Sequence, residues 1–255
     1  MPPDQQPAFG GSFATATVTL PNGKTYTTPD FSAIDGILDP NFGTINAIDN
    51  SGLSIYHGLL ISLRHRSRQF LSSVAYSYSR TTDQGTGYFN QFAQQLQRGP
   101  SQLDQPHRFV LTGVWTPELR FVKGFEFSGV LNLASGRPYT AVFDSSEVNF
   151  SIVPGEGFNS FRGPDVKNFD FSVSRDFHLG ERYQVRVAAE AFDLFNRANF
   201  QQNTVDNVQY TLTQTGANGT NGVWSAAPNS DFGAPLAIVP RFGARSFQFS
   251  TRVSF

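Results

Sequence analysis

The last ten residues of the chain, 246–255, alternate strictly between polar and apolar side chains. One set of alternate positions carries Phe247, Phe249, Thr251, Val253 and Phe255, and the other carries serine, glutamine and arginine. Successive side chains of a β-strand point to opposite faces, so the segment predicts a strand with one aromatic and one polar face. Chain ends usually fray unless other elements hold them, which makes an aromatic strand at this position a strong constraint on the fold.

Six further segments share this period of two and also predict strands. In the first of them, Leu59, Ile61 and Leu63 fall on one face. Alternation over short segments bounded by glycine, proline, asparagine and serine is typical of half-buried strands. The seven predicted strands are about 53–64, 69–80, 107–116, 125–134, 168–174, 182–195 and 246–255.

The connections between these strands alternate in length. Short links are expected at about 65–68, 117–123 and 178–181, and long ones at about 81–106, 136–164 and 196–244. Such long loops are uncommon in compact soluble domains. Outer-membrane β-barrels, in contrast, have short periplasmic turns and long extracellular loops. The pattern predicts an all-β fold, an antiparallel meander of about seven long strands that forms part of a transmembrane outer-membrane β-barrel.

The strand count also predicts the organisation of the chain. With Phe255 in the periplasm, counting back places the amino-terminal residues outside the cell. We expect residues 1–50 to be an extracellular loop region with a small hairpin at about 14–27, and residues 51–255 to be barrel strands. Bacterial barrels have an even number of strands. Seven strands, together with an amino terminus that lacks the basic and apolar regions of a signal peptide, predict the carboxy-terminal part of a larger barrel.

The composition excludes several classes of protein. The chain has 19 basic and 20 acidic residues, so it lacks the basic excess of a nucleic-acid-binding protein. It has no cysteine, which removes disulfides and thiolate metal sites. No apolar run approaches the roughly 18 residues that indicate a transmembrane helix. The 26 phenylalanines suit β-strands, and they suit a lipid-facing surface as well as a core.

Five phrases occur in order along the chain. They are Tyr56-His-Gly-Leu-Leu-Ile-Ser-Leu63, Asp104-Gln-Pro-His-Arg-Phe109, Leu133-Ala-Ser-Gly-Arg-Pro-Tyr139, Arg162-Gly-Pro-Asp-Val-Lys-Asn168 and Ala189-Glu-Ala-Phe-Asp-Leu-Phe-Asn196. Over residues 42–255 the chain resembles the carboxy-terminal barrel of TonB-dependent outer-membrane receptors, above all the Oar-like group with an amino-terminal carboxypeptidase-regulatory-like domain. The last strand resembles the signal by which outer-membrane barrels are recognised for insertion, carried here by Phe247, Phe249, Val253 and Phe255.

The resemblance implies a barrel of about 22 strands whose lumen is closed by an amino-terminal plug. It implies uptake of a large ligand with energy passed through TonB, in the outer membrane of a Gram-negative type bacterium. The expected partners are outer-membrane lipid, the barrel-insertion machinery and an extracellular ligand of unknown identity. The plug domain and TonB would be reached through an amino-terminal part that this sequence lacks. No nucleic-acid partner is expected.

Charged residues on the polar faces are the candidate site. A Lys or Arg that faces lipid at the midplane costs about 2–4 kcal/mol, so we expect these residues to face the lumen. They could form a network that holds a plug or lines a permeation path, or they could be solvated barrel lining with local ion pairs. The predicted lumen-facing residues are Arg64, Arg108, Glu126, Asp170, Arg186, Glu190 and Arg252.

No catalytic, metal or cofactor site is expected. The four histidines stand at predicted strand ends or turns, without the converging spacing of a metal site. The chain has no G-x-S-x-G nucleophile elbow. Gly155-Glu-Gly157 lacks the lysine and the strand–helix context of a phosphate loop. The chain is therefore not expected to be an enzyme.

The aromatic residues outside the terminal strand form two groups. Tyr76, Tyr78, Trp115 and Tyr183 lie near strand ends on the apolar faces and predict the aromatic girdles of a membrane barrel. The second group lies in the long loops and could bind ligand or pack together to order the loops. Its members are Phe89, Phe92, Phe143, Phe150, Phe158, Phe161, Phe200 and Tyr210.

A secreted all-β binding module without transport activity, a β-sandwich, is the alternative function class. The apolar faces discriminate between the two. A sandwich would bury them under a second sheet, whereas a barrel would expose a continuous belt of Phe, Leu and Val to the outside.

Overall fold

The computed structural model describes residues 15–29, 52–84, 98–144, 152–153, 156–180, 182–202, 204–216, 223–239 and 243–255. Every regular element in these ranges is a β-strand. Within them, no helix has the length and apolar character needed to cross a membrane.

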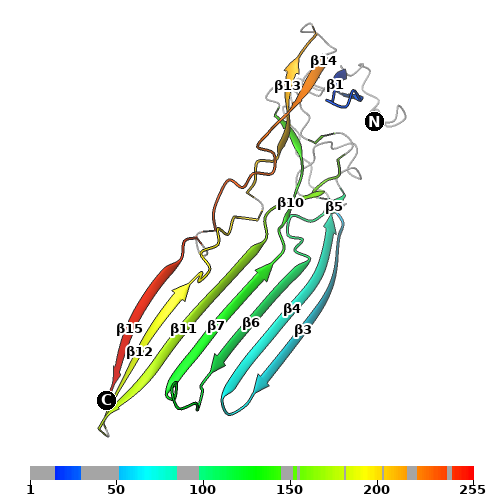
Figure 1. Ribbon diagram of the computed structural model, residues 1–255. Coiled ribbons are helices and arrows are strands. Elements are labelled where there is room, and N and C mark those ends of the chain that lie inside the picture. The colour runs from blue at the N-terminus through cyan, green and yellow to red at the C-terminus, as the bar shows by residue number, and fades with distance from the viewer. Residues whose placement is uncertain are drawn as a thin grey trace, which may run out of the picture.

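Seven long strands form one antiparallel sheet, which we call the large sheet (Figure 1). Its strands lie side by side in sequence order, and the two-residue strand β5 (Gly99–Pro100) pairs with the end of β4. The predicted antiparallel meander is therefore confirmed. The seven strands are β3 (Ser54–Arg66), β4 (Phe70–Asp83), β6 (His107–Trp115), β7 (Phe125–Ala134), β11 (Val166–Leu179), β12 (Tyr183–Phe192) and β15 (Ser246–Ser254).

Two of the three short links are tighter than predicted because the strands run further into them, whereas the link between β6 and β7 spans residues 116–124 and is slightly longer than predicted. His65 and Arg66 belong to β3 and pair with Ser72 and Leu71 of β4. In the same way His178 and Leu179, expected in a link, continue β11. Phe177 and Leu179 carry the apolar face of β11 to the turn, although Arg175 interrupts it. At the turn Gly180 takes a positive φ of 69°, which glycine adopts at no steric cost.

All the short links lie at one end of the large sheet, together with the carboxy terminus (Figure 1). The described parts of the long connections lie toward the opposite end. This end-to-end asymmetry is the arrangement predicted from the lengths of the connections.

A second, small sheet stands at the long-loop end, with strand order β2-β1-β14-β13-β9. Its first two strands, β1 (Thr15–Thr19) and β2 (Thr25–Pro29), are the predicted hairpin, which is confirmed. The other three correct the prediction that the long connections are plain loops. They are β9 (Val142–Asp144), β13 (Val208–Gln214) and β14 (Val223–Pro228). A two-stranded sheet of β8 (Pro138–Tyr139) and β10 (Phe161–Arg162) lies nearby.

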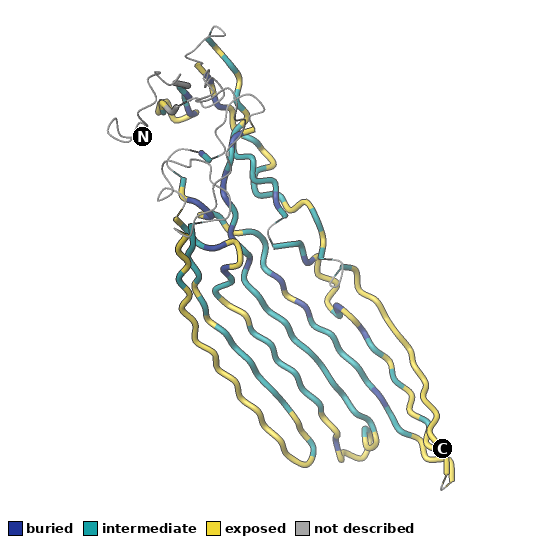
Figure 2. Tube along the Cα trace, turned by 180° about the vertical axis from the view of Figure 1, so that it is seen from behind, coloured by how far each residue is buried: buried dark blue, intermediate teal, exposed yellow. Residues whose placement is uncertain are grey.

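The main hydrophobic cluster among the described residues lies in and around the small sheet. Its fully buried members include Val18 of β1, Ala141 and Val153. The large sheet has no comparable core. β3 and β15 are exposed along almost their whole length, and Figures 1 and 2 show no described strand lying over the sheet. A sandwich would need such a second layer.

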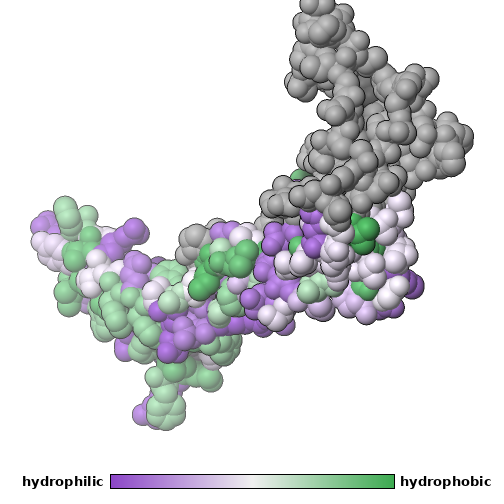
Figure 3. Space-filling view, turned by 90° about the horizontal axis from the view of Figure 1, so that it is seen from above, coloured by the Kyte–Doolittle hydropathy of each residue, from purple (hydrophilic) through white to green (hydrophobic). Residues whose placement is uncertain are grey.

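Hydrophobic residues consequently lie open at the surface of the large sheet. Leu63, Phe249 and Val253 keep more than half of their surface exposed, at 65%, 80% and 56%. Figure 3 shows hydrophobic residues lying openly at the surface in the part of the molecule farthest from the grey atoms. Exposing this much apolar surface to water is unfavourable, and contiguous apolar patches of this kind mark contacts with a membrane or another protein.

Candidate functional site at the long-loop end of the barrel

The two faces of the large sheet can be followed across all seven strands because the registers between them are unbroken. Directly paired residues in an antiparallel sheet place their side chains on the same face. Following the pairs, Phe109, Phe127, Leu131, Phe171, Val187 and Phe249 share one face, which we call the apolar face. The opposite or polar face carries all seven predicted lumen-facing residues, Arg64, Arg108, Glu126, Asp170, Arg186, Glu190 and Arg252.

The structure brings only part of this polar set together. Arg186 lies between two carboxylates: its guanidinium makes a bidentate pair with Asp176, with distances of 2.8 and 2.9 Å, and lies 3.8 Å from Glu126. Asp170 instead accepts hydrogen bonds from the Asn168 amide and from the backbone N–H of Asp193, both at 2.9 Å. Arg64, Arg108, Glu190 and Arg252 form no ion pair with a described residue.

The predicted strand 168–174 ends too early to include Asp176. This residue stands two positions beyond Ser174 and continues the polar alternation of β11. Extending the period of two by one more pair of residues would have placed it opposite Arg186. The bidentate Arg–carboxylate geometry makes this the best-formed ion pair on the polar face.

The four residues predicted to form aromatic girdles all lie on the apolar face, at both ends of the large sheet. Tyr76 and Tyr78 stand toward the long-loop end, where the Tyr76 hydroxyl lies 2.9 Å from His107 Nδ1. Trp115 and Tyr183 stand near the short links and are 39% and 52% exposed. Their positions toward the two ends fit the expected girdles, although phenylalanines such as Phe127, Phe169 and Phe171 also occupy the middle of this face.

Residues 246–254 form the last strand, β15, at an edge of the large sheet, and Phe255 follows it. β15 pairs only with β12, so the backbone N–H and C=O groups on its other side have no strand partner among the described residues. The four side chains of the predicted insertion signal share the apolar face. Phe247, Phe249, Val253 and Phe255 are 62%, 80%, 56% and 98% exposed.

Four segments meet at the long-loop end of the large sheet and form what we call the collar: residues 100–106, 135–140, 160–168 and 193–202. Four of the five phrases noted in the sequence contribute to it. Glycine is required where these segments cross. A Cβ on Gly136 would overlap the carbonyl oxygen of Gly163, and a Cβ on Gly163 would overlap the carbonyl oxygen of Gln202. The collar backbones can approach this closely only without side chains at these positions.

Asp104 is the buried centre of the collar, with 1% of its surface exposed. Its carboxylate forms an ion pair with Arg162 and accepts a hydrogen bond of 2.6 Å from the backbone N–H of Thr81. Arg162 also donates to the backbone carbonyls of Asp104 and Gly136, at 3.3 and 3.2 Å. One ion pair thereby ties the end of β4 to three collar segments.

A second cluster in the collar is built from side-chain amides. Gln105 Nε2 donates to the Ser135 carbonyl at 3.1 Å and to Gln202 Oε1 at 2.9 Å. Gln202 Nε2 donates to the same carbonyl at 2.7 Å. At the outer side, Asp165 pairs with Lys167 at 2.7 Å and with Arg197 at 3.2 Å. The hydrogen bond from Lys167, together with the positive charges of Lys167 and Arg197, holds the pKa of the Asp165 carboxyl below its ordinary value.

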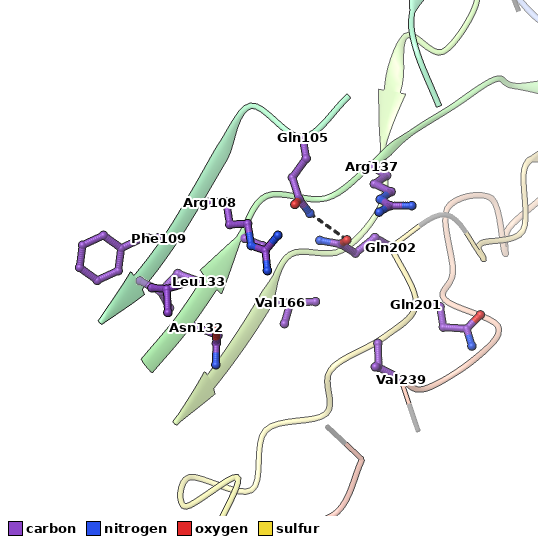
Figure 4. A pocket seen from close by; sticks show the side chains of 12 residues that line it. Gln105, Arg108, Phe109, Asn132, Leu133, Arg137, Val166, Gln201, Gln202 and Val239 are labelled. Carbon is purple, nitrogen blue, oxygen red and sulfur yellow. Dashed lines mark hydrogen bonds between the residues drawn. The ribbon is translucent and has the colours of Figure 1, made fainter. Parts of the chain in front are cut away.

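The collar and the adjoining ends of β6 and β7 line an open pocket of about 340 Å³ on the polar side of the sheet, which we call the collar pocket (Figure 4). Arg108 comes from β6, Asn132 from β7, and Arg137 from the segment that follows β7. Gln202 lies between the two arginines in Figure 4. The lining residues are Gln105, Arg108, Phe109, Val110, Asn132, Leu133, Ala134, Arg137, Val166, Gln201, Gln202 and Val239.

The loop aromatics that the structure describes pack within the loops. Phe143 and Tyr210 have ring centroids 6.1 Å apart, Phe158 is 6% exposed, and Phe161 meets Phe232 edge to face at 5.1 Å. These contacts favour the packing interpretation for these residues. Phe89, Phe92 and Phe150 lie outside the described residues. No three His, Cys, Asp or Glu side chains gather as a metal site in the part of the chain that the structure describes.

A family model described as an outer membrane beta barrel domain matches residues 4–155 and 154–231. The chain belongs to this outer membrane beta barrel family. No curated protein and no solved structure matches it. The family confirms the predicted fold class and supports an outer-membrane location. In outer-membrane barrels the outward-facing band of residues is apolar, and the exposed apolar face of the large sheet fits that pattern.

Deleting Phe255 from this barrel, or replacing it with aspartate, should lower its yield in the outer-membrane fraction several-fold. If residues 246–255 are an insertion signal, both changes alter the aromatic end of an edge strand, and edge strands are a usual place for pairing with another chain. The matched control is Phe121→Asp, because Phe121 is also near the short-link end and is 94% exposed. Equal membrane yields for Phe255→Asp and the unaltered chain would contradict the insertion signal.

Proposed function

We propose that the chain is the carboxy-terminal barrel portion of a TonB-dependent outer-membrane receptor that takes up a large extracellular ligand. The observation that carries this proposal is the pair of free edges of the large sheet. Counted through its antiparallel pairs, the sheet has β3 and β15 running in the same direction. Closing it as an all-antiparallel barrel requires an odd number of additional strands between them.

Those strands would belong to a larger barrel, in which the polar face lines the lumen. A barrel with many more strands than the seven described here leaves a lumen wide enough to need a plug. The Arg186 cluster and the uncompensated Arg64, Arg108 and Arg252 then face the plug or the permeation path. TonB would act through the plug, and the collar, at the opposite end from the short turns, would face the extracellular ligand.

Immunoblotting of outer-membrane fractions with an antibody raised against residues 246–255 tests the proposal. We expect a heat-modifiable band much larger than the 28.1 kDa of this chain, which cross-links to TonB in cells treated with formaldehyde. A matched strain that lacks TonB gives the same band without the cross-link. A folded 28.1 kDa band as the sole membrane species, or a large band with no cross-link to TonB, would contradict it.

A further inference from the structure

The collar pocket has an excess of positive charge. Arg108 and Arg137 both line it, and none of its lining residues is acidic. Neither arginine forms an ion pair with any described residue. This contrasts with Arg162 and Arg197 nearby, each of which has its own aspartate. The two guanidiniums are therefore available to an anion that enters the pocket.

Arg137 has a specific need for an acceptor. Its Nε is buried and has no hydrogen-bond partner among the described residues. A buried donor without a partner costs the free energy of its lost hydration, about 1–3 kcal/mol. A carboxylate or phosphate group is the acceptor that matches the planar donor fork of a guanidinium.

The side-chain carboxamides that line the pocket indicate which other groups the ligand should carry. The amide groups of Gln105 and Gln202 are held in place by their shared acceptor, the Ser135 carbonyl. The Gln105 side-chain oxygen and the Asn132 carboxamide, both at the pocket, have no hydrogen-bond partner among the described residues. Groups of this kind exchange hydrogen bonds with hydroxyls, which both donate and accept.

We propose that the collar pocket binds a small anionic carbohydrate, a sugar carrying a carboxylate or a phosphate. The arginines pair with the charged group and the carboxamides with the hydroxyls. The volume of about 340 Å³ lies at the lower end of the range for small-molecule sites. The assignment rests on the proposed receptor function, since the anionic sugar would be the recognised part of the larger ligand.

The experiment is calorimetric titration of the full chain, folded in detergent, with glucuronate and glucose 6-phosphate as probes. Glucose and inorganic phosphate are the matched controls, one without the charge and one without the hydroxyls. Each anionic sugar should bind at least about tenfold more tightly than either control. If glucose binds as tightly as glucuronate, the pocket is not an anion site. If inorganic phosphate binds as tightly as glucose 6-phosphate, the pocket does not recognise the sugar.

Two variants assign the binding to the pocket. Arg108→Gln and Arg137→Gln should each weaken binding of both probes by about tenfold, because each removes one charge-assisted contact. Arg120→Gln, an exposed arginine in the link between β6 and β7, should leave the affinity unchanged. Arg108 has no hydrogen bond to a described residue, so Arg108→Gln should keep its fold even if Arg137→Gln does not. Unchanged affinity in Arg108→Gln, or absence of binding to the unaltered chain, would overturn the proposal.

This outcome is separable from that of the receptor proposal. If the chain binds anionic sugars but the membrane species does not cross-link to TonB, the proposed sugar site stands and the proposed receptor function is contradicted. A TonB cross-link without sugar binding would do the reverse.

Discussion

Replacing Asp104 with alanine should lower the free energy of unfolding by about 1.5–3 kcal/mol, the range for losing hydrogen bonds to a charged group, because Asp104 is buried while Arg162 keeps 37% of its side chain exposed. Asp104 is 1% exposed and ties the backbone of Thr81 to the guanidinium of Arg162. Its loss leaves a buried backbone N–H without an acceptor and an arginine without its counter-charge. Asp104→Asn should have a smaller effect, since an amide oxygen can still accept from Thr81.

Urea unfolding of the chain in phospholipid vesicles, followed by tryptophan fluorescence, measures this change. Trp224 is 9% exposed within the cluster around the small sheet and reports on the long-loop end. Glu118→Ala is the control, because its ion pair with Arg68 is exposed on both sides and pairs of that kind contribute roughly 0–1 kcal/mol. A cost below about 1 kcal/mol for Asp104→Ala would show that the ion pair does not hold the collar together.

Phe171→Arg should destabilise the membrane-inserted chain by about 2–4 kcal/mol, whereas Ser172→Arg should change its stability by less than about 1 kcal/mol. The two positions are neighbours near the middle of β11 but lie on opposite faces. An arginine at 171 would be placed in lipid beside Phe127 and Phe169, whose rings pack against Phe171. An arginine at 172 would lie opposite Glu190 on the polar face.

The pair of variants is a direct test of which face meets lipid, measured as the urea midpoint in vesicles. A one-residue slip would exchange the two faces of a strand, so the expected difference has a definite sign. Equal destabilisation by both variants would mean that both faces of β11 are shielded from water and lipid alike. A larger cost for Ser172→Arg would invert the assignment of the lumen.

The long strands were predictable because each is half apolar and half polar, and the period of two is visible in a single segment. Phe169, Phe171 and Val173 were sufficient to locate β11. The period of two, together with the cost of a charge that faces lipid, was enough to assign the polar set to one face before the pairs were known.

The collar was not predictable in the same way. Asp104 and Arg162 are separated by 58 positions, and nothing in the local pattern of either residue indicates the other. β13 and β14 have some alternation, as in Val208, Tyr210 and Leu212, but they lie in a segment rich in glycine, asparagine and threonine that also suits a loop. Their strands form because partners elsewhere in the chain, β1 and β9, complete the small sheet.

The parallel pairing of β1 with β14 has a consequence for how the chain folds. Each pair among the seven long strands joins two that follow one another in the order of those seven, so it can form as soon as the second long strand is available. Thr17, in contrast, pairs with Val223, and that contact closes a loop that contains six of the seven long strands. Loop-closure entropy grows with length and contacts of high sequence separation form slowly. The small sheet is therefore the part of the molecule whose formation depends on nearly all of the rest being in place.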